Sequence, residues 1–127
     1  MTHSPDVELR LPAEGAYVAV LRMTTAGLAA RLDFTLDDIE DLRMAVGEAC
    51  ALVLENADPG GDLRATFDLS DGSIRVAVSA DSAGDDHGPD ESSFGWQVLT
   101  ALTSDVLTRR EGPLLWVSFT VRSSIAA

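Results

Sequence analysis

Glu48 is the acidic side chain whose place in the sequence could support chemistry. On a helical wheel of residues 39–57, Glu48 lies opposite an apolar stripe that would face the core. A carboxylate on such an outer face can accept a proton from a hydroxyl group beside it. Leu52 follows one turn later on the outer side, which indicates that this face meets something other than water. The alternative is an ordinary solvated face with an isolated exposed leucine.

The charge and residue content exclude several other kinds of chemistry. The 127 residues include 21 acidic and 9 basic ones, for a net charge of −12. All nine basic residues are arginine, which excludes lysine-dependent reactions, and the acidic balance disfavours nucleic-acid binding. The single cysteine, Cys50, falls on the apolar stripe, where we expect an inert packing residue. The chain start does not resemble a signal peptide and no apolar run could span a membrane, so the sequence predicts one cytoplasmic domain over residues 1–127.

Hydrophobic patterns predict the elements that position Glu48. The expected order is β-α-α-β-β-α-β-β, which indicates an α+β two-layer sandwich. A five-stranded, mostly antiparallel sheet would carry three helices on one face. The predicted strands cover about residues 7–11, 63–70, 73–80, 106–108 and 115–121, and the predicted helices about residues 14–31, 36–57 and 94–102.

Two local signals refine this outline. Thr35 and Asp38 form the pattern of a capping box at the start of the second helix. Trp116 lies on the face of the last strand that no helix would cover, where it serves either edge packing or an interface. A partly uncovered sheet face would also permit a homodimer.

Two segments resemble a known family. Residues 41–50, DLRMAVGEAC, resemble the N-box helix of the bacterial anti-sigma factor and serine-protein kinase family. This family is a branch of the histidine-kinase-type (GHKL) ATPases with the Bergerat fold. Residues 93–102 and the following Ser104-Asp105-Val106 resemble a later family segment in the same order. The chain is most similar to the actinobacterial branch that restrains stress-response sigma factors of the sigma-F and sigma-B type.

The resemblance implies a role for each matching residue in the N-box. Glu48 corresponds to the glutamate that activates water or a target serine. The family's asparagine, which holds Mg²⁺ and phosphates, is replaced by Leu52, which has no metal-binding atom. Asn56 lies one further turn along and could substitute only in a rebuilt cleft. The resemblance therefore provides no metal ligand at this position.

The glycine boxes of the family are only partly present. Asp81 matches the aspartate that binds the adenine amino group, although it could also be an ordinary loop residue. Gly84 follows three residues later instead of two, and the next two residues are acids that would repel phosphate. Ser93 replaces the first glycine of the phosphate box, and Gly95 keeps the second. We therefore expect Mg-ATP chemistry to be weak or absent.

Three functions remain open at this point. The resemblance implies an anti-sigma factor that sequesters a sigma factor and is released by a STAS-type antagonist. The second hypothesis is an active serine kinase, with Glu48 as the base and Mg-ATP in the cleft. The third is an acidic adaptor without a sigma partner, such as a DNA mimic. Acidic residues cluster at 33–41 and 81–91, which gives two candidate contact edges for a basic partner.

Overall fold

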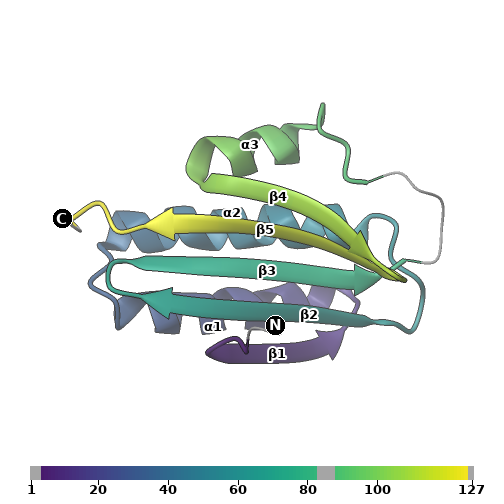
Figure 1. The fold of residues 1–127 in the computed structure, drawn as a ribbon, viewed down its shortest axis with the longest axis horizontal. Coiled ribbons are helices and arrows are strands. Elements are labelled where there is room, and N and C mark those ends of the chain that lie inside the picture. Colours follow the sequence, from purple (N-terminus) through teal and green to yellow (C-terminus); the bar gives the residue numbers. More distant parts are fainter. Residues whose placement is uncertain (1–3, 83–87, 126–127) are drawn as a thin grey trace.

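The computed structural model describes residues 4–82 and 88–125, and these residues build one five-stranded antiparallel sheet. The strands lie side by side in the order β1-β2-β3-β5-β4 (Figure 1). Every paired neighbour is antiparallel, so the expected fold class is confirmed. The strands are β1 Val7–Pro12, β2 Asp62–Ser70, β3 Ser73–Asp81, β4 Ser104–Glu111 and β5 Leu114–Arg122.

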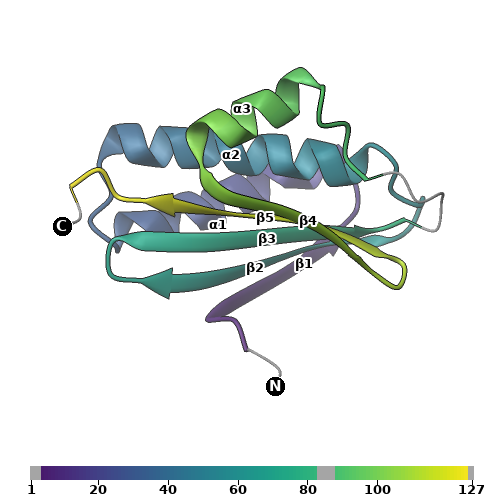
Figure 2. The same ribbon diagram turned by 45° about the horizontal axis from the view of Figure 1, so that its top comes forward.

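The helices all cover one face of this sheet. They are α1 Val18–Ala30, preceded by a short 3-10 turn η1 Gly15–Tyr17, then α2 Leu36–Leu54 and α3 Phe94–Leu102. Figure 2 shows α1 and α2 packed against the sheet, with α3 beside α2 and the opposite sheet face open. The predicted element order and the two-layer arrangement are therefore confirmed.

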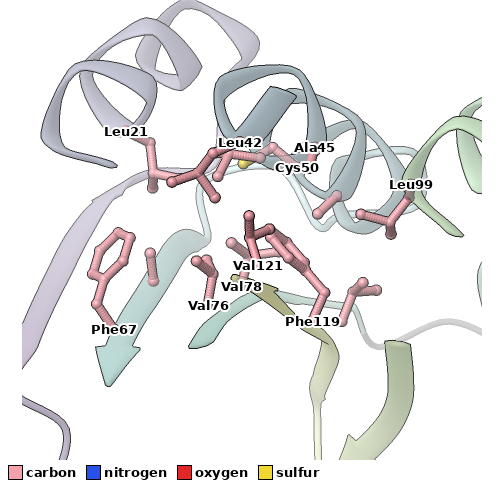
Figure 3. Packing of buried hydrophobic residues seen from close by; sticks show 14 of the residues in the cluster. Leu21, Leu42, Ala45, Cys50, Phe67, Val76, Val78, Leu99, Phe119 and Val121 are labelled. Carbon is pink, nitrogen blue, oxygen red and sulfur yellow. The ribbon is translucent and has the colours of Figure 1, made fainter. Parts of the chain in front are cut away.

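Strict alternation along the strands explains the core. In β2, β3 and β5 every second side chain is apolar, and all of these except the half-buried Leu69 are buried beneath the helices, as a half-buried strand requires. The large buried side chains from both layers meet in one cluster, which includes Leu21, Leu42, Phe67 and Phe119 (Figure 3). Cys50 lies in this cluster, and its burial raises the pKa of the thiol to about 12, against a smaller lowering by Arg22. The prediction of a core cysteine is confirmed.

The capping box at the start of α2 is also present. The Thr35 hydroxyl accepts from the Asp38 amide and the Asp38 carboxylate accepts from the Thr35 amide, both at 3.1 Å. The predicted helix end near residue 57 is wrong by three residues. The helix ends at Leu54 because the following segment turns, and Gly60 adopts a positive φ of 80° there. The strand predicted at 106–108 is longer in the structure, since β5 supplies backbone partners across the whole hairpin.

Candidate functional site

The structure brings Glu48 and Gly95 into close contact. Glu48 lies half-buried on α2, and α3 crosses beside it. A Cβ atom on residue 95 would lie only 2.9 Å from the Glu48 Oε1 atom, so the absence of a side chain at Gly95 allows this approach. Two residues that are 47 positions apart in the sequence thus share one side of the expected nucleotide site.

Ser93 holds the first turn of α3 on the same side. Its Oγ atom accepts a hydrogen bond of 3.1 Å from the Trp96 amide, which makes Ser93 the N-cap of the helix. Gly95 therefore belongs to the first turn, where backbone amides have no partner within the helix. Glu48, Ser93 and Gly95, three of the predicted site residues, thus lie together at the α2–α3 contact.

Asp81 lies at the end of β3 and has a structural partner. Its Oδ2 atom accepts a hydrogen bond of 3.1 Å from the amide of Asp62, the first residue of β2. A Cβ atom on Gly61 would lie 2.9 Å from the same oxygen, and the Asp58 amide donates to the Asp81 carbonyl at 2.8 Å. Asp81 therefore fastens the connection between α2 and β2 to the end of β3.

Leu52 is buried although it lies outside the core-facing stripe of the helical wheel, so the expectation that this side of α2 meets something other than water is confirmed. Its side chain is 4% exposed and belongs to the hydrophobic core. The helical wheel considers one helix alone, whereas α2 contacts α1, α3 and the sheet. Asn56 is exposed and lies beyond the end of α2, and Gly84 lies outside the described residues.

The donor set at this position does not fit a magnesium ion. Mg²⁺ needs oxygen ligands in octahedral geometry, and Leu52 supplies none. Among residues 4–82 and 88–125, no group of three or more His, Cys, Asp or Glu side chains could hold a metal. The α2–α3 contact places the Glu48 carboxylate beside the first turn of α3, an arrangement that suits proton transfer.

A second feature, which the sequence analysis missed, lies between α1 and α2. A hollow of about 530 Å³ is lined by small residues such as Ala19 and Ala51, together with Arg22 and Glu55. The Arg22 guanidinium lies so close over Gly47 that a Cβ atom there would collide with it. Within the described part of the chain, Arg22 forms no ion pair. A glycine in the middle of α2, where it weakens the helix, was the signal for this close approach.

The acidic edge at the start of α2 is fixed by the C-terminal segment. The amide and hydroxyl of Ser124 both donate to Asp38 Oδ2 at 3.0 Å, in addition to the bond from Thr35. The hydrogen bond from the Ser124 amide, followed by those from Thr35 and the Ser124 hydroxyl, holds the pKa of Asp38 below its usual value of 3.8, against a smaller opposing effect of burial. The neighbouring acids Asp37 and Asp41 stay exposed. The predicted edge at 81–91 lies only partly within the described residues.

Comparison with known proteins defines the class. The chain belongs to the histidine kinase-like ATPase domain family, whose model matches residues 11–121. The fold agrees with a solved structure of the RsbU and RsbW domains of Rv1364c from Mycobacterium tuberculosis, with a TM-score of 0.69 and 18% identity. That match covers 94% of this chain and 33% of the other chain.

Among curated proteins, the chain is similar to serine-protein kinase RsbW. It is 40% identical to RsbW of Halalkalibacterium halodurans over 79 residues, which are 61% of this chain and 49% of that protein. It is 35% identical to RsbW of Bacillus thuringiensis over 81 residues, which are 62% of this chain and 51% of that protein. The matched part spans about half the length of these relatives, and the predicted family resemblance is confirmed. No helix of the described residues is long and apolar enough to cross a membrane.

Proposed function

We propose that the chain is an anti-sigma factor, which sequesters a stress-response sigma factor and is released by a STAS-type antagonist. We further propose that it acts as a single cytoplasmic domain, as a homodimer, with a degenerate ATP site. Leu52 is the observation that favours partner binding over catalysis. It is a buried apolar residue at the position of the family's magnesium-binding asparagine. The fold does not depend on this ligand, so the surfaces that bind partner proteins can be present without it.

The helical layer supports a protein partner with a basic surface. Asp37 and Asp41 are exposed at the start of α2, and opposite charges across an interface steer association and fix the register. Further along α2, the hollow between α1 and α2 offers Arg22 as a positive group for a partner's carboxylate. A surface that combines exposed carboxylates with an arginine suits a specific protein partner better than it suits nonspecific cation binding.

Binding to a purified stress-response sigma factor tests this proposal, measured by titration calorimetry. We expect the Asp37→Asn and Asp41→Asn double variant to bind about tenfold more weakly, with a smaller dependence on salt. Asp71→Asn, in the exposed turn between β2 and β3, is the matched control and should bind as the wild type does. Absence of binding, together with a cytoplasmic pull-down that recovers other proteins but no sigma factor, would favour an adaptor without a sigma partner.

One observation favours the serine kinase as a second function. Glu48 keeps its carboxylate beside Gly95 and the first turn of α3, where a base could act on a serine hydroxyl. Incubation with the antagonist and labelled ATP tests this role, with Glu48→Ala as the control that abolishes transfer. Trp96 follows Gly95 directly and reports nucleotide by its fluorescence. A flat titration with millimolar Mg-ATP supports the degenerate site and counts against the kinase.

A further inference from the structure

One side of α2 carries a row of carboxylates, which is formed by Asp37, Asp41, Glu48 and Glu55. Their spacings of four, seven and seven residues place them within about 40° of one another around the helix axis. Glu48 lies against Gly95, so this carboxylate row runs along the side of α2 that is next to α3 (Figure 2). The row extends over about five turns of α2, or about 27 Å.

The negative charge of the carboxylate row is not balanced by arginine. Among the residues that the structure describes, none of the four carboxylates forms an ion pair. Glu40, by contrast, lies on the side of α2 that faces α1, as Gly47 does seven residues later, and it pairs with Arg43 at 3.2 Å. Residues 88–103, which form α3 and the segment before it, contain two acids and no base.

The stability of α2 does not account for the carboxylate row. Asp37 lies in the first turn, where the helix dipole favours a negative charge, but Glu55 follows the last turn, where the dipole disfavours it. The last turn of α2, which the structure describes in full, has no basic residue to compensate. Asp37 and Asp41 are also like charges one turn apart, which destabilises a helix. A cationic partner explains these charges better than the folding of the free chain does.

Two exposed apolar side chains flank the middle of the carboxylate row. Phe94 is 78% exposed and directly precedes Gly95, which lies against Glu48. Met44 is 53% exposed and lies one turn before Glu48 on α2. Large apolar side chains that are exposed side by side with charged groups are typical of binding surfaces. The α2–α3 edge, formed by the carboxylate row with Met44 and Phe94, therefore has an apolar centre within a negatively charged surface.

We propose that the α2–α3 edge binds a basic amphipathic helix of a partner protein. The inference rests on the proposed anti-sigma function and assigns the kind of sigma-factor segment that contacts this edge. Lysine or arginine side chains spaced four, seven and seven residues apart on that helix would lie opposite the carboxylate row. An apolar side chain on the same face would pack against Phe94 and Met44.

The spacing of the carboxylate row favours a helix over an extended segment. A helix that lies along α2 has the same rise per residue, so its cations recur on one face at the spacing of the row. An extended chain rises about 3.3 Å per residue and would need cations about two, three and three residues apart. Side chains three residues apart on a strand point to opposite faces, so a strand could not present all four cations to the row.

Two synthetic peptides test this surface separately from any natural partner. The first is an alanine-rich helix with lysines at the proposed spacing and leucine on the same face. The second has the same composition in scrambled order. Fluorescence anisotropy measures the binding of each labelled peptide to the full chain at low salt. We expect the patterned peptide to bind about tenfold more tightly than the scrambled one.

Substitutions in the chain locate the bound peptide. Replacing Asp41 by Asn together with Glu55 by Gln should weaken the patterned peptide about tenfold and reduce its dependence on salt. Phe94→Ala should weaken it about tenfold through lost apolar contact. Glu40→Gln is the matched charge control, because Glu40 is exposed on the same helix but on its α1 side. Met23→Ala, at a position that is 72% exposed on α1, is the apolar control. Both controls should bind as the wild type does.

Three outcomes would overturn the inference. They are equal binding of the two peptides, a loss from Glu40→Gln as large as that from the double variant, and unchanged binding by Phe94→Ala. Circular dichroism checks that each variant is folded, and the same variants are titrated with the sigma factor. Binding of the patterned peptide as expected, without binding of a sigma factor, contradicts only the proposed anti-sigma function. Binding of a sigma factor that none of these substitutions weakens contradicts only the assignment of the α2–α3 edge.

Discussion

The two sides of the expected nucleotide site differ in what they retain. At the α2–α3 contact, Glu48 and Gly95 keep the residue types that the family resemblance implies and lie close together, whereas Ser93 replaces a glycine and caps α3. Leu52, by contrast, lies in the core with no oxygen to offer, and Asp81 fastens the connection between α2 and β2 to the end of β3. The difference teaches that residues at an expected site can have packing and capping roles of their own, as Asp81 and Ser93 do.

Replacing Leu52 by asparagine is the largest test of this comparison. Leu52→Asn puts an amide into a site that is 4% exposed. We therefore expect the free energy of unfolding, measured in urea, to fall by about 3 kcal/mol, from lost burial and an unpaired polar group. Leu36→Asn, at an exposed position, should change it by less than about 0.5 kcal/mol. A stable Leu52→Asn variant that gains Mg-dependent ATP binding would show that this one substitution is enough to restore the metal site.

The second test asks whether Asp81 is structural. Asp81→Ala leaves the Asp62 amide without its acceptor, so we expect a loss of about 1.5 kcal/mol in the free energy of unfolding. Asp81→Asn keeps an acceptor oxygen and should stay within about 0.5 kcal/mol of the wild type. An adenine-binding role predicts the reverse pattern, in which Asp81→Asn weakens ATP binding and Asp81→Ala leaves stability unchanged.

The third test concerns Ser93 at the start of α3. Ser93→Ala removes the cap of α3, so we expect a loss of about 1 kcal/mol, and faster hydrogen exchange at the Trp96 amide. Ser93→Gly should cost only a few tenths of a kcal/mol, because glycine is tolerated at an N-cap. Ser92→Ala is the neighbouring control, since the Ser92 hydroxyl bonds only to exposed Asp90 in the described contacts. Equal losses from Ser92→Ala and Ser93→Ala would remove the capping role.

The sequence predicts the framework better than the site, for a physical reason. Alternation and capping act between residues close in the chain, so the β2–β3 hairpin and the Thr35–Asp38 box could be predicted. The site depends on distant contacts. The bond between Asp62 and Asp81 spans 19 residues. Arg22 meets Gly47 only after α1 and α2 pack.

The smallest expected effect concerns the contact between Glu48 and Gly95. Gly95→Ala places a Cβ atom 2.9 Å from Glu48 Oε1, but the carboxylate is the end of a flexible side chain and can rotate away. Alanine is also a better helix residue than glycine by about 0.8 kcal/mol, which offsets the displacement. We expect Gly95→Ala alone to change the free energy of unfolding by less than about 0.5 kcal/mol.

A double-mutant cycle isolates this contact. In the Glu48→Ala background nothing opposes the new methyl group, so Gly95→Ala should stabilise the chain by about 0.8 kcal/mol. The difference between the two backgrounds then measures the displacement of the carboxylate. The same Gly→Ala change at Gly61 meets the Asp58 carbonyl at 3.3 Å as well as Asp81, and backbone yields less easily than a side-chain end. Gly61→Ala should therefore cost more than Gly95→Ala. A cycle without coupling would mean that Glu48 and Gly95 do not share one site in solution.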